Sequence, residues 1–268
     1  MHYAVLKLMR NVTTWAAVLA MTATAGLPAA RADEAQAKAL FKAMSDYLTA
    51  QKILSYEYDT TLEIVTKEKQ KLGLASSGSV TLNRPDKIRT TRSGGFAHVE
   101  MVFDGKTLSL LGKNANQYVQ ADMPGTIDHL VDVLRDKFHR PLPGADLLMS
   151  DVYKQLMPLV VNVKDLGSGV IHGVECDHLA FRTREVDWQI WIAQGDRPYP
   201  CRYVVTSTKM AGAPQYSIDV RAWKTGAEVA PDDFSFKVPT GATKLKPGDL
   251  PDIDELPGIC RRKLEGAK

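Results

Sequence analysis

The residues best suited to chemistry are five polar side chains between positions 172 and 178. His172, Glu175, Cys176, Asp177 and His178 carry imidazole, carboxylate and thiol groups, which are the usual ligands of zinc. Alternation along a strand would place Cys176 and His178 on one face. A metal site needs three or four converging ligands, and no second cluster supplies them. We therefore predict a polar hairpin strand with no bound metal and no cofactor.

A nucleophilic triad can also be assembled from Ser168, Asp177 and His178. The segment Gly167-Ser168-Gly169 is shorter than the turn that exposes a nucleophilic serine, and its flanks do not read as a strand followed by a helix. No segment has the glycine spacing of a nucleotide-binding loop. The sequence therefore predicts a protein without catalytic residues.

Three cysteines follow the N-terminal region: Cys176, Cys201 and Cys260. In an exported chain they would meet oxidising conditions, where pairing is expected. We expect a Cys176–Cys201 disulfide, because these residues begin two strands that have one strand between them. Closing that loop would stabilise the fold by roughly 3 kcal/mol in the chain-entropy view. Cys260, in a polar tail, is expected to be a free thiol or to pair between chains.

The first 32 residues have the pattern of a secretory signal peptide. Basic residues precede an uncharged, mostly small and apolar run over 14–27, and Ala30-Arg31-Ala32 fits the pattern that signal peptidase cuts. The run is short for a membrane-spanning helix. We expect cleavage after Ala32, which would make Asp33 the first residue of a protein released into the periplasm without a transmembrane segment.

The charge of the mature chain is balanced. The full sequence has 34 Lys and Arg against 31 Asp and Glu, and the first 32 residues hold three of the basic residues and no acidic one. A neutral domain offers no electrostatic reason to bind nucleic acid or an anionic membrane. With no linker or repeat in sight, we expect one domain over 33–240, a helical insert near 126–157 and an irregular tail over 241–268.

Three segments have the apolar spacing of helices. The first begins at Asp33, which can act as its N-cap, and ends near Gln51. The second begins after Thr126, another N-cap, and carries an apolar stripe to Phe138. The third covers 145–157. Because all three have an apolar face, they must pack on the rest of the fold.

Alternating or β-rich runs between turn signals predict two groups of strands. The first group begins at Ile53 and continues over 73–82, 87–92, 96–103, 107–111 and 117–120. The second comprises 163–171, 174–183, 186–192, 201–208 and 216–220. Short turns between neighbours favour antiparallel pairing. We predict a mainly β (α+β) fold, in which a curved open antiparallel half-barrel sheet carries the helices on its concave side.

Three long segments carry a family resemblance: LNRPDKIRTTRSGGFAHVEMVFDGKTLSLLGKNANQY, PGTIDHLVDVLRD and GVECDHLAFRTREVDWQIWIAQGDRPYPCRYVVT. They resemble a family of uncharacterised predicted periplasmic proteins, which is similar in fold to the LolA/LolB-type lipoprotein carriers. The resemblance covers nearly all of the mature chain and implies an open half-barrel with helices as a lid. It implies no activity, and no segment matches a lipoprotein-carrier motif residue by residue.

A curved sheet with helices at its open side can enclose a cavity for an apolar ligand. We expect the cavity wall to include apolar residues of strands and helices, namely Tyr56, Tyr58, Leu62, Met101, Phe103, Leu130, Leu134, Met149 and Trp188. Methionine in this set would adapt to more than one ligand. An ordinary core would use the same residue types, so the alternation alone does not separate the two.

Three hypotheses for function follow. The first is a non-enzymatic periplasmic carrier that binds a hydrophobic small molecule or lipid. The second is a cell-envelope scaffold or interaction module, with an envelope protein as partner and a core filled by its own side chains. The third is a hydrolase or metal-dependent enzyme centred on the segment from His172 to His178. The sequence does not give an oligomeric state.

Overall fold

The computed structural model describes residues 26–95, 97–137 and 144–248, with side chains from Asp33 onward. The signal-peptide prediction for 1–32, the cleavage after Ala32 and the prediction for Cys260 therefore rest wholly or partly outside the described residues. Within them, no helix is long and apolar enough to cross a membrane.

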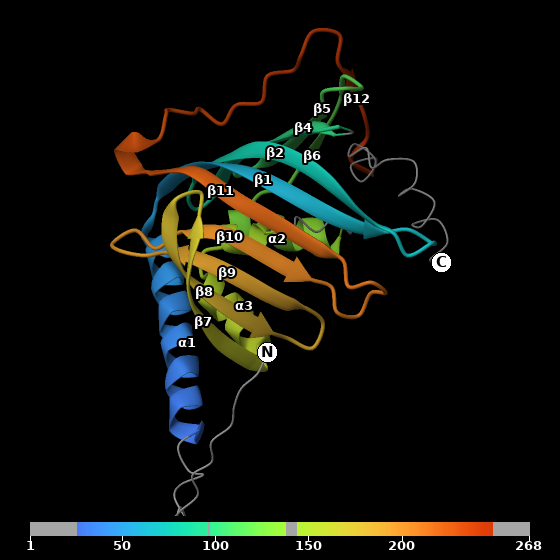
Figure 1. Cartoon of the computed structure of the whole chain (residues 1–268). Coiled ribbons are helices and arrows are strands. Elements are labelled where there is room, and N and C mark those ends of the chain that lie inside the picture. Colours follow the sequence, from blue (N-terminus) through green and yellow to red (C-terminus); the bar gives the residue numbers. More distant parts are fainter. Residues whose placement is uncertain (1–25, 96, 138–143, 249–268) are drawn as a thin grey trace, which may run out of the picture.

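Twelve strands of the described chain form one sheet, which is curved and open (Figure 1). The strands of the first meander are β1 (Ile53–Val65), β2 (Lys71–Asn83), β3 (Lys87–Gly94), β4 (His98–Phe103), β5 (Thr107–Gly112) and β6 (Gln117–Asp122). Those of the second are β7 (Asn162–Ile171), β8 (Val174–Arg182), β9 (Asp187–Ala193), β10 (Pro200–Thr206) and β11 (Gln215–Thr225). The predicted open antiparallel sheet is confirmed.

The two meanders join at the middle of the sheet, where β1 pairs with β11 in antiparallel register. The resulting order is β12-β6-β5-β4-β3-β2-β1-β11-β10-β9-β8-β7. Residues far apart in sequence meet at this seam, as when Thr60 faces Ile218. The short strand β12 (Thr243–Lys244) is the exception to antiparallel pairing, since it lies parallel to β6.

The helices lie on one side of the sheet, in its concavity (Figure 1). They are α1 (Gly26–Ala50), α2 (Ile127–Asp136), η1 (Ala145–Leu148), α3 (Val152–Leu156) and η2 (Met157–Leu159). Helix α1 packs against β7 and β9, whereas α2 packs against η1 and the first meander. The concave face therefore has an α1 half and an α2 half.

Thr126 caps α2 as predicted, because its hydroxyl accepts a hydrogen bond from the amide of His129 at 3.2 Å. The prediction that Asp33 caps the first helix is wrong for the full chain, since α1 already begins at Gly26. Asp33 is thus an interior helical residue.

The predicted helix over 145–157 is also wrong as one element. The chain becomes extended at Met149, with ψ of 160°, so η1 ends there. A new helix, α3, starts after Asp151, whose carboxylate accepts from the amide of Lys154 at 2.9 Å. Pro158 lies in the next short turn, η2. Capping and proline therefore divide an apolar stripe that looked continuous.

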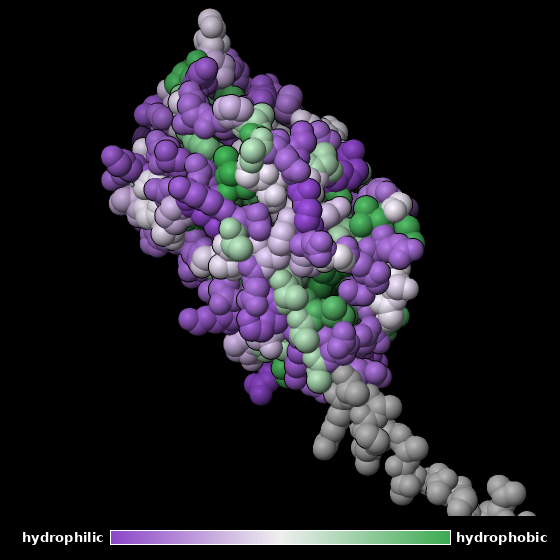
Figure 2. All heavy atoms as spheres, turned by 90° about the vertical axis from the view of Figure 1, so that its left-hand side faces the viewer, coloured by the Kyte–Doolittle hydropathy of each residue, from purple (hydrophilic) through white to green (hydrophobic). Residues whose placement is uncertain are grey.

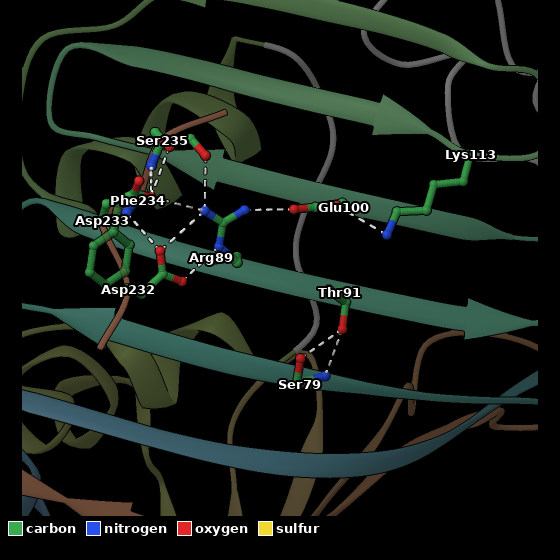
Figure 3. A network of polar contacts seen from close by, with 9 residues as sticks. All are labelled: Ser79, Arg89, Thr91, Glu100, Lys113, Asp232, Asp233, Phe234 and Ser235. Atoms are coloured by element: carbon green, nitrogen blue, oxygen red, sulfur yellow. Dashed lines mark hydrogen bonds and ion pairs between the residues drawn. The ribbon is translucent and has the colours of Figure 1, made fainter. Parts of the chain in front are cut away.

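The C-terminal arm follows the short turn η3 (Gly226–Glu228) and runs back to β6 across the outer face of the first meander (Figure 1). Arg89 on β3 holds it by two hydrogen bonds to the Asp232 carboxylate, at 2.7 and 3.1 Å, and by one to the carbonyl of Ser235 (Figure 3). The Phe234 side chain is buried. This arm is therefore fixed to the sheet.

One face of the molecule is mostly polar. On the face shown in Figure 2, hydrophilic residues predominate and hydrophobic ones gather in separate small patches. The large apolar side chains exposed in the described chain are Leu159, Val161, Leu166, Val170, Met210 and Val238.

Candidate ligand-binding cavity

A cavity of about 130 Å³ lies between α2 and the concave face of the first meander. Its wall is mainly apolar and draws on strands β1 to β5, α2, η1 and β11. The lining residues are Tyr56, Tyr58, Val80, Ile88, Thr90, Arg92, Val99, Met101, Leu108, Leu110, Ile127, Leu130, Val131, Leu134, Gly144, Ala145, Leu148, Tyr216 and Ile218. An apolar cavity with few polar groups in its wall is typical of small-molecule sites.

Period-two alternation brings these side chains to one face of the sheet. On β3, for example, Ile88, Thr90 and Arg92 point into the cavity, whereas Arg89 between them points to the outer face and the C-terminal arm. On α2, the helical period places Leu130 and Leu134 on the face that is buried against the sheet.

The turn between β2 and β3 fastens α2 and η1 to the sheet. The amide of Ile127 donates to the Pro85 carbonyl at 2.8 Å, and Nη1 of Arg84 donates to the Leu148 carbonyl at 2.9 Å. The Arg84 Nε and Nη2 atoms are buried and have no hydrogen-bond partner among the described residues. Burial lowers the pKa of this guanidinium. One turn thus contacts both ends of the segment that covers the cavity.

Two further contacts hold this covering segment. The Asp128 carboxylate accepts from the amide and hydroxyl of Ser150, at 2.9 and 2.5 Å. The Tyr203 hydroxyl lies 3.0 Å from a carboxylate oxygen of Asp146. Burial raises the pKa of Asp146 above its ordinary value, although the hydrogen bond with Tyr203 opposes this.

The structure separates the predicted cavity residues into two groups. Tyr56, Tyr58, Met101, Leu130 and Leu134 line the cavity. The others lie elsewhere: the side chains of Phe103, Met149 and Trp188 are buried in the fold outside the cavity wall, and Leu62 is partly exposed near the end of β1. Their assignment as ligand contacts is therefore not supported by their positions.

Sequence reasoning missed several lining residues, including Ile88, Thr90 and Arg92 on β3 and Leu108 and Leu110 on β5. Alternation on β3 would have found the first three as one face. Tyr216 and Ile218 belong to β11 and reach the cavity because of the β1–β11 seam. No local pattern reveals that seam.

The histidines between 172 and 178 make other contacts. His178 stacks on Trp191 with 3.9 Å between ring centroids, and its Nε2 lies 2.9 Å from Oε1 of Gln189. Burial lowers the pKa of His178. His172 Nε2 lies 3.6 Å from Asp219. Within the described chain, no group of three His, Cys, Asp or Glu side chains is placed to hold a metal ion.

The triad does not assemble either. Ser168 faces Asp177 across the β7–β8 pair, and His178, as the next residue on β8, points to the opposite face of the sheet. Its Nε2 is engaged by Gln189. These three residues therefore offer no nucleophile and base in contact.

Cys176 and Cys201 are unbonded thiols in this structure. Both are buried in one small cluster with Ile171 and Ala193, which brings two cysteines from non-neighbouring strands together. Burial raises the pKa of both thiols. The disulfide stays a prediction.

A second hollow, of about 520 Å³, lies on the outer face beside the C-terminal arm. Its polar groups are engaged with one another: Arg89 bonds Glu100 at 2.6 Å and Lys113 lies 3.0 Å from the same carboxylate (Figure 3). Burial disfavours the Asp232 carboxylate, but hydrogen bonds from Arg89 and the Phe234 amide outweigh it and lower the pKa of Asp232. This network fastens the arm.

Fold and cavity together define a class of protein: one open, mainly antiparallel sheet and a short helix that enclose an apolar cavity. The chain belongs to the DUF2092 family of predicted periplasmic proteins, whose model matches residues 37–246. That match spans nearly all of the described structure. No curated protein matches the chain in sequence.

Several solved structures are distantly similar. The lipoprotein LppX of Mycobacterium tuberculosis is 15% identical, and the match covers 74% of this chain and 100% of LppX with a TM-score of 0.45. A chain of the Pseudomonas aeruginosa MucA/MucB complex is 14% identical, with 75% and 61% covered and a TM-score of 0.43. A LolA superfamily protein from Nitrosomonas europaea is 9% identical, with 75% and 97% covered and a TM-score of 0.36.

Proposed function

We propose that this protein is a non-enzymatic periplasmic carrier that binds a lipid or an acyl chain between its sheet and α2. The observation that supports this most directly is the apolar cavity under α2. Burying apolar surface there would supply binding free energy of roughly 25 cal/mol per Å² of area removed from water. The proposed ligand contacts are Tyr56, Tyr58, Met101, Leu130 and Leu134, together with the β3 and β5 residues of the wall.

The cavity is small for a lipid ligand. At about 130 Å³ it is close to the roughly 150 Å³ of an engineered cavity that accepts benzene. A long acyl chain needs more room, so α2 and η1 must move away from the sheet to admit one. The covering segment is short, and it is hydrogen-bonded to the sheet at the Arg84-Pro85 turn and at Tyr203.

Arg84 supports a movable cover. In the closed position its guanidinium makes one hydrogen bond and leaves two buried nitrogen atoms without one among the described residues. A buried donor left without a partner costs about 1–3 kcal/mol. Moving the cover would expose these donors to water and recover part of that cost.

Native mass spectrometry of the protein purified from the periplasm tests the proposal. We expect a discrete added mass that organic solvent extracts as lipid. Val131→Phe, which fills the cavity from α2, should lose the added mass and keep the fold, whereas Leu166→Phe, at an exposed position on β7, should retain it. A bare polypeptide mass for the unsubstituted protein would contradict the carrier function and favour an envelope scaffold.

A further inference from the structure

Three hairpin turns lie at one end of the sheet, on the same side in Figure 1. They are the β1–β2 turn over 66–70, the β8–β9 turn over 183–186 and the β10–β11 turn over 207–214. The Lys71 ammonium donates to the Ala213 carbonyl at 3.4 Å, which joins the first turn to the third. The Thr208 hydroxyl donates to the Glu185 carbonyl at 2.8 Å, which joins the third turn to the second. We call this continuous surface the hairpin end.

The hairpin end is basic, although the mature chain as a whole is balanced. Its three turns hold four exposed basic residues against two acidic ones, namely Lys67, Lys69, Arg184 and Lys209 against Glu68 and Glu185. Three turns at the opposite end, β2–β3, β4–β5 and β9–β10, each combine one acidic with one basic residue: Asp86 with Arg84, Asp104 with Lys106 and Asp196 with Arg197. The positive charge is therefore concentrated at one end of the sheet.

An apolar side chain projects from the same surface. Met210, next to Lys209, is 57% exposed. Methionine is flexible and polarizable, so it adapts to an irregular apolar partner. An exposed apolar side chain among basic ones combines apolar burial with attraction to anions, which is how proteins attach to the interface of an anionic membrane.

The concave face continues from the cavity toward the hairpin end. Beyond the lining residue Tyr58, alternation keeps Leu62 and Ile64 of β1 on the same face. Their partners in register on β2 are Leu74 and Leu72. All four aliphatic side chains are partly exposed. An apolar ligand that enters at this end would therefore meet an aliphatic surface before it reaches the cavity.

A lipid bilayer with anionic headgroups fits this surface. Each lysine close to such a bilayer strengthens binding by about fivefold. The headgroup boundary also offers Met210 an apolar environment. An acidic protein would attract the same lysines, but it would leave Met210 and the aliphatic surface in water, where their burial contributes nothing. The combination of charge and apolar surface therefore favours the bilayer.

We infer that the hairpin end binds the surface of an anionic lipid bilayer, with Met210 inserted among the headgroups and Lys67, Lys69 and Lys209 beside their phosphates. The inference extends the proposed carrier function, because it places a source of lipid beside the aliphatic surface that leads to the cavity.

Flotation of the full mature protein with lipid vesicles tests the inference. One set of vesicles is phosphatidylcholine alone, and the other is an equal mixture of phosphatidylcholine and phosphatidylglycerol. We expect binding to the mixed vesicles and little binding to phosphatidylcholine. Raising the salt concentration should weaken the binding, because salt screens the attraction between exposed charges.

A combined variant with Lys67→Gln, Lys69→Gln and Lys209→Gln should bind the mixed vesicles more weakly by about tenfold or more. The matched control removes three exposed lysines at the opposite end: Lys52→Gln, Lys106→Gln and Lys224→Gln. Because the two variants have the same net charge, only the position of the lysines differs. Equal binding by both variants would overturn the assignment to the hairpin end.

Met210→Trp reports on insertion. The fluorescence emission of the new indole should move to shorter wavelength with mixed vesicles, because the ring leaves water for the headgroup boundary. The emission should not move with phosphatidylcholine vesicles. Binding to mixed vesicles with unchanged emission would overturn the insertion of residue 210.

The failure of the inference can be distinguished from that of the function. Absence of binding to both vesicle types would overturn the bilayer as partner, and so would lysine-dependent retention on immobilised polyglutamate without vesicle binding, which would indicate an acidic protein. An extractable lipid in native mass spectrometry would leave the carrier function in place in either case. Vesicle binding by a protein that carries no lipid would overturn the carrier function and leave the membrane-binding surface.

Discussion

The two halves of the concave face belong to the same sheet, and each has a helix packed on it. The side chains between helix and sheet differ between the two halves. In the α1 half, Phe41 of α1 packs against Phe181 and Trp188, with 5.2 Å between its ring centroid and each of theirs. Those two rings stack on each other at 3.9 Å. Phe41 is 0% exposed, so this half is a closed core.

In the α2 half the helix offers aliphatic side chains instead. Ile127, Leu130, Val131 and Leu134 face strands whose inward residues include Thr90, and about 130 Å³ remains empty. In this protein, the half with an aromatic ring on its helix is filled by side chains, and the half with aliphatic residues on its helix contains a cavity. Four predictions test this contrast.

The largest expected effect is in the α1 half. Phe41→Ala should lower the free energy of unfolding by about 3–5 kcal/mol, because it removes a fully buried ring and leaves a cavity among aromatic neighbours. Urea denaturation measures the loss. A change below about 1 kcal/mol would show that this half can collapse around the gap and is not a rigid core.

The next effect concerns the two cysteines of the second meander, which lie in a separate small cluster. If Cys176 and Cys201 pair after export, oxidised protein should be more stable than reduced protein by roughly 3 kcal/mol. Thiol titration under denaturing conditions, with and without reductant, checks the pairing, and Cys176→Ser gives the reference without the bond. Two titratable thiols at these positions in protein taken from the periplasm would exclude the disulfide.

Enlarging a side chain should have opposite consequences in the two halves. Ala37→Leu, at a 0% exposed position of α1, should cost about 1–3 kcal/mol by overpacking. Val131→Phe enters the cavity and should change stability by less than about 1 kcal/mol. Thermal unfolding of the two variants side by side measures the contrast, and equal losses would argue against a usable cavity.

The smallest effect is a pH dependence confined to the α2 half. Burial raises the pKa of Asp146 in the closed structure, so the closed state is favoured while this carboxyl is protonated. That contribution is complete below the ordinary Asp pKa of about 3.9 and is lost as the pH rises through the raised pKa. Hydrogen exchange of α2 should therefore quicken with rising pH relative to α1, beyond the intrinsic pH effect.

Asp146→Asn supplies the control for this last prediction. The amide keeps the shape and a hydrogen bond with Tyr203 but does not ionise. Its α2 exchange, corrected for intrinsic rates, should not depend on pH. The same pH dependence in Asp146→Asn and in the unsubstituted protein would assign the effect to another group.

Much of the fold and part of the site were accessible from sequence. Alternation identified the strands of both meanders, and the Thr126 cap marked the start of α2. Five residues expected in the cavity wall lie there, because an inward position on a strand or helix follows from its period. Trp188 was expected there on the same grounds and instead packs against Phe41.

The sequence determines the local features of the structure. These are the segments that form strands, the faces that are apolar, and the capping residues at which a helix begins. These follow from neighbours in the chain, through backbone propensity and period. Three features depend on tertiary structure: β1 pairs with β11, Arg89 holds an arm residue as distant as Asp232, and space remains under α2. Whether space remains depends on the summed volumes of side chains that meet from distant segments, and no local pattern records that sum.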